Sequence, residues 1–476
     1  MSPRGATTGA VVLAAGRSKR FGGTQPKVLH PLCGRPIIEH VLRTLREVHR
    51  SQRLANVVVV VPPGKQVEKA IAGLKLPFPV AFAVQKEPTG TGAASLIGLR
   101  KLGDVDDVLI LAGDVPLVSP SSLVSLVRGR RDAGACGALL TATLDDGGPY
   151  GRIVREGGAI TGIVEARDAT PDELAIREIN TCIVCYTRDA LQQTLPKLRT
   201  DNAQGELYLT DIVGSLIAAG EHLTSVDGDP RDVLGTNTRA EFALVARLCR
   251  ERIVGDLMDR GVTVLDPDTT YVDAGVVVAP DTVLHPNTYL QGTTKVGTGA
   301  EIGPSVQIVD STVGDGTVVT FAKVVGSKIG PRCSVGPFAS LRPGTVLKAG
   351  AKAGTFVEMK KASIGEGSKV PHLSYMGDVT VGRDANIGAG TITSNYDGKD
   401  KHETRIGDEV FTGSDTIFIA PVRVGRGAYT GAGSVVNRDV APGEVVYGVP
   451  AKPRGKKAKP TRKKQAKRTK RKGRRG

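Results

Sequence analysis

The sequence contains no tryptophan, and aromatic residues make up only 4% of its 476 residues. Its six cysteines are scattered, and only Cys182 and Cys185 lie close together. Their segment has the pattern of a strand, which would point the two side chains to opposite faces. Small buried side chains are therefore favoured over a redox or metal pair. No disulfide framework is implied, which is typical of a protein of a reducing cytosol.

Long hydrophobic runs are also lacking. The first apolar run, residues 10–15, is too short for the core of a signal peptide, and no stretch approaches the ~20 apolar residues of a membrane span. We therefore expect a cytoplasmic protein. Glycine, in contrast, is abundant at 60 residues. A sequence rich in Gly, Val and Ile and poor in aromatics predicts many short strands and turns.

The basic excess is concentrated in one segment. The net charge is +16, and residues 454–476 carry fourteen Lys or Arg and no acid, so the rest of the chain has a charge of only +2 (16 − 14). Such a tail cannot bury apolar surface, and we expect it to be disordered. A solvated tail is favoured over a dedicated polyanion-binding arm, although non-specific contact with polyanions is expected either way.

The first half of the chain alternates short apolar runs with helical patterns. Strands are expected at 10–15, 56–61 and 108–112, with helices at 36–49 and 92–102 between them. This alternation predicts a Rossmann-like α/β domain over residues 1–239 with a mostly parallel sheet. Ligands of such sheets bind beyond the carboxyl ends of the strands.

A helical linker is expected next, at 240–260, because apolar residues recur there at helical spacing. From about 270 an aliphatic residue followed by glycine recurs with a period of six. Six residues per face and three faces per coil predict a parallel β-helix of hexapeptide repeats over residues 261–453. We expect this β-helix to be left-handed. The polar segment 393–405 interrupts the repeat and is expected to form an excursion loop.

Residues that suit nucleotide chemistry follow the first strand and a later one. The loop at Gly16 would present backbone N–H groups to phosphates, and Arg20 and Lys27 would add positive charge. Asp114 follows another strand end and is the natural magnesium ligand, because a hard cation prefers carboxylate and amide oxygens. A helix-capping role is the alternative for Asp114.

The segments Leu13–Gly16 and Pro26–His30 resemble the signature of sugar-1-phosphate nucleotidyltransferases. With Gly90–Gly92, Gly113–Pro116 and further motifs, the chain resembles the bacterial bifunctional N-acetylglucosamine-1-phosphate uridyltransferase / glucosamine-1-phosphate N-acetyltransferase from about residue 9 to 446. The resemblance implies that acetyl-CoA first acetylates glucosamine-1-phosphate. UTP then gives UDP-N-acetylglucosamine, a precursor of peptidoglycan and lipopolysaccharide, in a Mg²⁺-dependent step.

The resemblance also assigns roles to residues of the first domain. Arg20 and Lys27 would be catalytic, and Asp114 and Asn237 would hold the metal. The UTP and UDP-N-acetylglucosamine site would comprise Leu13, Ala14, Ala15, Gly16, Lys27, Gln85, Gly90, Thr91, Gly113, Asp114, Gly151, Glu165, Asn180 and Asn237. The family usually has Gly-Thr where this chain has Ser18-Lys19, and we expect altered mobility of the loop there.

A second set of residues lies in the repeat region. Transfer of acetyl to an amine needs the amine unprotonated, so His372 suits a general base, and Glu358 would orient or polarise it. A surface histidine on a coil is the alternative. The resemblance implies that Arg342, Lys360, Tyr375 and Asn386 hold the sugar phosphate. It also implies an acetyl-CoA site formed by Ala389, Asn395, Tyr396, Ser414 and Ala432.

The family resemblance also implies a homotrimer, with the excursion at 393–405 reaching a neighbouring subunit. One departure lies at 446–453, where the arginine that meets the CoA phosphates in the family is missing; Lys452 or the basic tail would substitute. Two rival hypotheses remain open. Either the β-helix is only an oligomerising module, or the whole chain is a non-catalytic scaffold; the intact residues in both regions argue against each.

Overall fold

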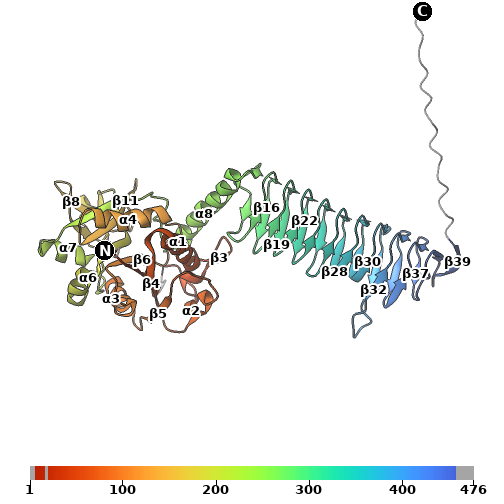
Figure 1. Cartoon of the computed structure of the whole chain (residues 1–476), viewed down its shortest axis with the longest axis horizontal. Coiled ribbons are helices and arrows are strands. Elements are labelled where there is room, and N and C mark those ends of the chain that lie inside the picture. Colours follow the sequence, from red (N-terminus) through yellow and green to blue (C-terminus); the bar gives the residue numbers. More distant parts are fainter. Residues whose placement is uncertain (1–5, 17–19, 457–476) are drawn as a thin grey trace, which may run out of the picture. The chain divides into compact units, whose positions relative to one another are not determined.

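The computed structural model describes residues 6–16 and 20–456. The chain divides into two compact units, one ending at Arg252 and the other beginning at Ile253 (Figure 1). The first unit is built around one sheet, and the second is a coil of short strands. Among the described residues, no helix combines the length and the apolar composition needed to cross a membrane.

The sheet of the first unit has the strand order β11-β7-β10-β6-β1-β4-β5, with β8 and β9 attached at β10. Strands β1, β4, β5 and β6 run parallel, whereas β10 is antiparallel to both of its neighbours. The strands are β1 (Thr8–Leu13), β4 (Leu54–Val61), β5 (Val80–Val84), β6 (Asp107–Ala112), β7 (Gly137–Thr143), β8 (Arg152–Glu156), β9 (Ala159–Val164), β10 (Glu178–Thr187) and β11 (Leu223–Asp227), with the small hairpin β2 (Pro31–Leu32) and β3 (Arg35–Pro36).

Helices cover both faces of this sheet, as the alternating sequence pattern predicts. Apolar residues of α1, α2 and α4 pack on one face, and those of α3, α6 and α7 pack on the other. The helices are α1 (Ile37–Gln52), α2 (Gln66–Ile71), α3 (Thr91–Leu102), α4 (Pro120–Asp132), α5 (Pro171–Leu174), α6 (Arg188–Thr194) and α7 (Asp211–Ala218), with short 3₁₀ turns η1 (Lys27–Leu29) and η2 (Leu195–Lys197).

A buried ion pair joins α4 to the centre of the sheet. Asp107, which is fully buried at the start of β6, lies 2.7 Å from Arg130 and 2.6 Å from Arg131. A buried carboxylate needs such partners because burial of an unpaired charge is costly.

The prediction for Cys182 was wrong in one respect. Cys185 is buried, but Cys182 is exposed, with a positive φ of 58°. The pairing of β10 with β7 shifts register between Asn180 and Val184, and this bulge turns Cys182 outward.

The expected connector is the helix α8 (Arg239–Asp259). The second unit follows as a parallel β-helix, which confirms the interpretation of the six-residue period. Its stacked aliphatics are buried; along one face Leu284, Ile302 and Val319 lie in register from coil to coil. Each coil hydrogen-bonds to the coils before and after it, so its polar backbone is satisfied.

Strands of the β-helix form three sheets. The first two are β12 (Thr263–Val264), β15 (Val283–Leu284), β18 (Glu301–Ile302), β21 (Val318–Val319), β24 (Ser334–Val335), β27 (Lys352–Thr355) and β29 (Lys369–His372), then β33 (Phe411–Thr412), β36 (Tyr429–Thr430), β38 (Glu444–Tyr447) and β39 (Lys452–Lys456). The third is β13 (Tyr271–Val272), β14 (Val277–Val278), β16 (Thr288–Gln291), β17 (Lys295–Val296), β19 (Val306–Val309), β20 (Thr312–Val313), β22 (Ala322–Val325), β23 (Lys328–Ile329), β25 (Ala339–Leu341), β26 (Val346–Leu347), β28 (Glu358–Ile364), β30 (Tyr375–Val381), β31 (Ile392–Ser394), β32 (Thr404–Ile406), β34 (Ile417–Ile419), β35 (Val422–Val424) and β37 (Val435–Val436).

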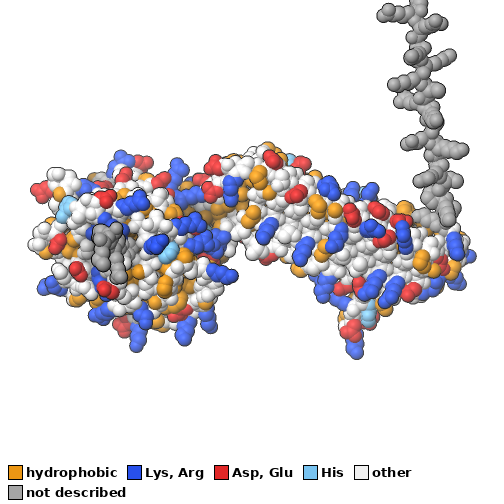
Figure 2. Space-filling view, viewed as in Figure 1, with side chains coloured by type: hydrophobic (Ala, Val, Ile, Leu, Met, Phe, Trp, Pro, Cys, Tyr) orange, Lys and Arg blue, Asp and Glu red, His pale blue; other side chains and the backbone are white. Residues whose placement is uncertain are grey.

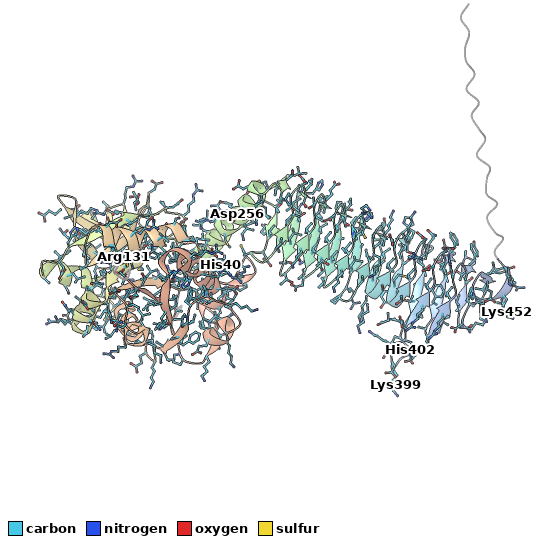
Figure 3. The ribbon with its side chains drawn as sticks, viewed as in Figure 1. His40, Arg131, Asp256, Lys399, His402 and Lys452 are labelled. Atoms are coloured by element: carbon cyan, nitrogen blue, oxygen red, sulfur yellow. The ribbon has the colours of Figure 1, made fainter. Side chains whose placement is uncertain are left out.

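The polar segment between β31 and β32 leaves the coil as an excursion. It carries Lys399 and His402 near its tip (Figure 3), and charged side chains cover that tip (Figure 2). At the C-terminal end of the unit, β39 continues to Lys456, three residues past the predicted end of the domain. The rest of the predicted disordered tail, 457–476, lies outside the described residues.

Candidate active sites

The first site lies where the strands of the N-terminal sheet end. Strand β1 ends at Leu13 and strand β6 ends at Ala112. The carbonyl of Leu13 accepts a hydrogen bond of 2.8 Å from the backbone N–H of Gly113, the residue that follows β6. Ala14 and Ala15 are buried behind this edge, whereas Gly16 and Arg20 are exposed. The structure therefore brings the predicted phosphate loop next to the strand end that carries Asp114. The predicted change of mobility at Ser18-Lys19 lies outside the described residues.

Lys27 joins the two predicted metal ligands. Its ammonium forms an ion pair with Asp114 and lies 3.1 Å from Oδ1 of Asn237. A carboxylate and an amide oxygen, 123 residues apart in sequence, thus converge on one positive charge. Among the residues that the structure describes, no group of three or more His, Cys, Asp or Glu side chains is arranged so that it could hold a metal ion.

Residues predicted to contact the base line the start of α3. Gln85 is 5% exposed, and its side chain donates to the carbonyl of Gly90. Gly90 has φ of 115°, and a Cβ there would lie 2.3 Å from the Leu207 carbonyl oxygen. Only glycine fits this approach. The Thr91 hydroxyl accepts from the Leu209 N–H at 3.0 Å, so the segment around 207–209 closes over the same turn.

The predicted sugar-binding residues form a second cluster. The Gly151 carbonyl accepts from the Asn180 N–H at 2.8 Å, and a Cβ on Gly151 would lie 3.5 Å from the Glu165 carboxyl. Burial raises the pKa of Glu165, and a hydrogen bond of 3.1 Å from the Thr210 hydroxyl only partly opposes it. The cluster is a small, largely desolvated polar site with room held open by glycine.

Several supporting residues were assigned no role from the sequence. Tyr150 accepts a hydrogen bond from the Gly235 N–H at 3.1 Å, and Glu241 accepts one from the Asn237 N–H at 2.6 Å. Arg239 stacks over Phe21 at 4.2 Å and so anchors the loop that carries Arg20. Each of these contacts joins residues far apart in the sequence or involves a backbone N–H group. The sequence alone therefore does not reveal it. A helix-start pattern at Glu241 was the only local hint.

The second site lies on neighbouring coils of the β-helix. Arg342 forms an ion pair of 2.8 Å with Glu358 on the next coil, and Glu358 is in register with Tyr375 on the coil after that. Lys360 lies two residues from Glu358 on β28. The structure therefore brings together four of the predicted residues on one face, at the ends of strands that the six-residue repeat aligns.

His372 lies at the corner beside this face. It ends β29 and is exposed, and Tyr375 begins β30 three residues later. Hydrogen bonds continue this corner from coil to coil. The Gly390 N–H donates to the His372 carbonyl, the Asp415 N–H to the Ala389 carbonyl and the Gly433 N–H to the Ser414 carbonyl.

These bonds align the predicted base with three residues of the predicted acetyl-CoA site: Ala389, Ser414 and Ala432. Asn386 precedes Ala389 by three residues and lies in the sheet that ends at this corner, where it pairs with Lys369 and Phe411. The described part of this unit thus gathers its predicted residues along a single edge and the face beside it.

Two more residues of the predicted acetyl-CoA site lie in the excursion. Asn395 is 7% exposed and donates to Asp378 at 2.5 Å, whereas Tyr396 is 59% exposed on the excursion itself. A side-chain hydrogen bond with Lys401 lowers the pKa of Lys360, and the positive charge of Lys401 lowers it further. Asp378 and Lys401 were not singled out from sequence, because nothing in the repeat marks which coil the excursion folds against.

At the end of the β-helix an arginine appears where the sequence departs from the family pattern. Strand β39 runs antiparallel to β38, and the guanidinium of Arg454 lies 5.1 Å from the ring centre of Tyr447. Lys452, on the same strand, is exposed (Figure 3).

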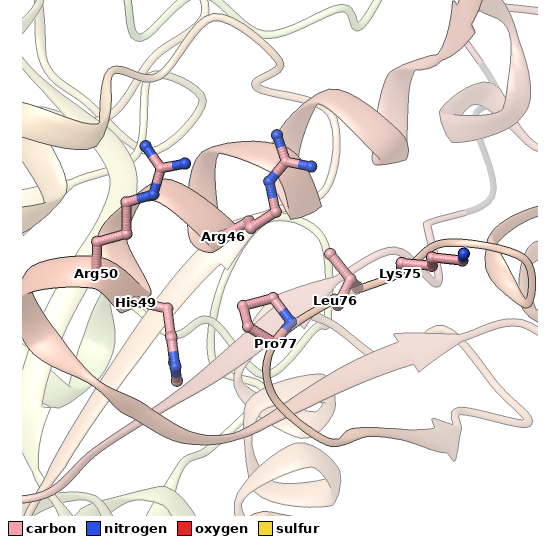
Figure 4. A pocket seen from close by; sticks show the side chains of 6 residues that line it. All are labelled: Arg46, His49, Arg50, Lys75, Leu76 and Pro77. Carbon is pink, nitrogen blue, oxygen red and sulfur yellow. The ribbon is translucent and has the colours of Figure 1, made fainter.

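A hollow of about 390 Å³ lies elsewhere in the first unit (Figure 4). It is lined by the last two turns of α1 and the segment before β5: Arg46, His49, Arg50, Lys75, Leu76 and Pro77. This is the edge where the parallel strands β4 and β5 begin, opposite the edge that carries Asp114. The arginines Arg46 and Arg50 both pair with Glu47. The hollow is therefore separate from the candidate site.

Comparisons with known proteins identify the family of the chain. Residues 10–223 match the family model described as the MobA-like NTP transferase domain. The chain is 47% identical over 441 residues to the "Bifunctional protein GlmU" of Streptomyces avermitilis, which covers 91% of this chain and 90% of that protein. It is 43% identical over 433 residues to the protein of the same name from Carboxydothermus hydrogenoformans, covering 90% and 95%. At this identity and coverage, the chain belongs to the family of the bifunctional protein GlmU.

Proposed function

We propose that this chain makes UDP-N-acetylglucosamine in two steps, acetyl transfer to glucosamine-1-phosphate and then uridylyl transfer to the product. The observation that carries the proposal is that one chain of this family keeps both polar sets intact. Lys27 meets Asp114 and Asn237 in one unit, and Arg342, Glu358 and His372 lie on adjoining coils in the other. A scaffold or a single-function enzyme would need only one of these sets, or neither.

In the uridylyl transfer, a phosphate oxygen of N-acetylglucosamine-1-phosphate attacks the α-phosphorus of UTP, and diphosphate leaves. Arg20 and Lys27 bind the triphosphate and stabilise its charge, which is the main contribution that a protein makes to such transfers. The backbone at Gly16 approaches the phosphates closely. Gln85, Gly90 and Thr91 bind the uracil, and Gly151, Glu165 and Asn180 hold the sugar.

Asp114 and Asn237 fit a magnesium ion, because the Lys27 ammonium shows that their oxygens converge on a single cation. When bound, the ion neutralises charge on the phosphates and polarises the reacting phosphorus. Lys27 then turns from these oxygens to the triphosphate. The side chain therefore has two positions, one in the free protein and one with nucleotide.

In the acetyl transfer, the amine of glucosamine-1-phosphate attacks the thioester carbonyl of acetyl-CoA, and the CoA thiol leaves. His372 accepts the proton that the amine loses. Glu358 orients the histidine and, with Arg342 and Lys360, sets the charge of the face where the sugar phosphate binds. Tyr375 and Asn386 complete the sugar-phosphate site. Ala389, Asn395, Tyr396, Ser414 and Ala432 bind acetyl-CoA.

The active assembly that we propose is a homotrimer in the cytoplasm. Tyr396 is exposed on an excursion that leaves its own coil, so a neighbouring subunit would complete the acetyl-CoA site. The test is sedimentation of the purified chain together with mixing of two inactive variants. If His372→Asn and Tyr396→Ala subunits regain acetyl transfer on mixing, the site is shared between chains; no regain would contradict the shared site.

The function is tested with glucosamine-1-phosphate, acetyl-CoA, UTP and Mg²⁺, measuring CoA thiol and diphosphate release separately. We expect Asp114→Ala to reduce uridylyl transfer by at least about 10²-fold, because metal coordination supplies several kcal/mol of transition-state stabilisation. Acetyl transfer should stay unchanged. Equal loss of both activities, or full uridylyl transfer in the variant, would sink the assignment of Asp114.

A further inference from the structure

Two cysteines that the proposed reactions do not use lie against each other in the first unit. Cys33 is the first residue of the two-residue turn between β2 and β3, and Cys33 and Gly34 both have positive φ, 42° and 79°. This is the geometry of a tight hairpin turn. The turn places the Cys33 sulfur 3.9 Å from the Ala246 carbonyl oxygen of α8, one turn before Cys249.

The two thiols are in direct contact. Cys33 hydrogen-bonds through its side chain to Cys249, which is 5% exposed. That hydrogen bond lowers the pKa of Cys249, and the nearby Arg252 and Arg35 lower it further, against the opposing effect of burial. Positive neighbours and a donating thiol favour the thiolate of Cys249, and Cys33 beside it is partly exposed to solvent. Two arginines also disfavour a bound metal cation here.

We infer that Cys33 and Cys249 are an oxidisable pair that closes to a disulfide with hydrogen peroxide and ties the β2–β3 hairpin to α8. In this step the Cys249 thiolate attacks one peroxide oxygen, the O–O bond breaks, and a proton from solvent completes the water that leaves. The resulting sulfenic acid is attacked by Cys33 sulfur, which loses its proton, and a second water leaves as the S–S bond forms. Two thiols and one peroxide give one disulfide and two waters.

The location of the pair links it to the uridylyl-transfer site. Cys33 follows Lys27 by six residues, and α8, which carries Cys249, begins two residues after Asn237. The disulfide would therefore join the segments that hold the two ends of the Lys27–Asn237 contact. This part of the inference rests on the proposed function, in which Lys27 leaves Asn237 when nucleotide binds. Oxidation would restrict that movement.

The experiment uses the full chain, reduced and then treated with hydrogen peroxide. Peptide mapping should show Cys33 joined to Cys249, and dithiothreitol should reverse the link. Uridylyl-transfer kcat/KM should fall on oxidation, within the roughly 10²-fold that a 1 Å misplacement of a positioned group costs. Acetyl transfer should not change. Cys33→Ser and Cys249→Ser should keep their uridylyl transfer under peroxide.

Cys136→Ser is the matched control. Cys136 is also partly exposed, but burial raises its pKa to about 11, so the variant should remain as sensitive as the natural chain. Absence of the Cys33–Cys249 peptide, or a link to another cysteine, would overturn the pair. A link that leaves uridylyl transfer unaltered would overturn its effect on the site. A reduced chain without uridylyl transfer would instead contradict the proposed function, while the peptide map still tests the pair.

Discussion

Single side chains in both units are held by neighbours that the sequence motifs do not contain. Thr210 donates to Glu165, and Asp378 accepts from Asn395. These contacts fix the orientation of each group before a substrate arrives. Preorganised groups stabilise a transition state more effectively than mobile ones, because they need not reorient during the reaction.

At the residue scale, His372 gives the clearest expectation. His372→Asn should lower acetyl-transfer kcat by about 10²–10⁴-fold, because asparagine cannot accept the proton. Raising the pH should partly rescue the variant, since more of the substrate amine is then already unprotonated. Uridylyl transfer serves as the internal control and should be unaffected. Natural-like acetylation by the variant at neutral pH would mean that His372 is only a surface residue of the coil.

Glu165 should impose a pH dependence on stability. Its pKa is raised by burial, so the folded state holds this proton to a higher pH than the unfolded state does. Stability from this residue is therefore present at low pH and is lost as pH rises through the interval from the unfolded value, about 4.3, to the folded one. We expect Glu165→Gln to raise the Tm of the first unit more at pH 7 than at pH 4. An equal change at both pH values would count against it.

At the scale of elements, the coils stack so closely that some positions admit no side chain. A Cβ on Gly365 would lie 2.1 Å from the Gly382 carbonyl oxygen of the next coil. Gly365 follows Ile364, which is in register with Val381. The aliphatic-glycine pairs of the sequence thus have two separate causes. The aliphatic fills the interior, and the glycine allows the backbones to approach at the corner.

Gly365→Ala should destabilise the β-helix by about 1–3 kcal/mol, as other overpacking substitutions do. Gly255→Ala, in α8, is the matched control: no heavy atom lies within 4 Å of its added Cβ. Alanine should stabilise a helix there by roughly 0.5–1 kcal/mol. Equilibrium denaturation followed by circular dichroism measures both. Equal stability of the two variants would contradict the close approach of the backbones at Gly365.

Periodicity predicted the elements well and their partners poorly. The strand expected at 108–112 is β6 (Asp107–Ala112), and the six-residue period predicted the β-helix. Both predictions were possible because each pattern depends on residues that are close together in the sequence. Tyr150, Asp378 and the partner role of Glu241 depend on which segments the folded chain brings together. The bulge that exposes Cys182 likewise results from sheet pairing and not from a local pattern.

At the scale of the whole molecule, the division into two units matches a division of chemistry. The nucleotide residues lie before Arg252 and the acetyl-transfer residues after Ile253. Each set is supported by its own core, since the apolar clusters of the two units share no residue. Variants in one unit should therefore leave the other half-reaction intact, as the expectations above require.

The end of the chain offers a test at this scale. A chain cut after Lys456 keeps Arg454 beside Tyr447, whereas one cut after Pro453 loses it. We expect the shorter chain to show a raised KM for acetyl-CoA, because a positive charge that would meet the CoA phosphates is removed. The longer one should resemble the full chain except at low salt. An unchanged KM in both would show that this end does not touch the cofactor.

The excursion between β31 and β32 leaves the stacking undisturbed. Thr380 pairs with Arg405, 25 residues on, whereas Ser363 pairs with Thr380, 17 residues on, and the buried rungs continue without a shift. The inserted residues therefore leave the coil without changing how the strands on either side of them pair. Since the entropy of closing a loop grows only slowly with its length, segments of other lengths could be grafted at 396–401. The β-helix would then act as a constant scaffold that presents different inserted segments at the same place.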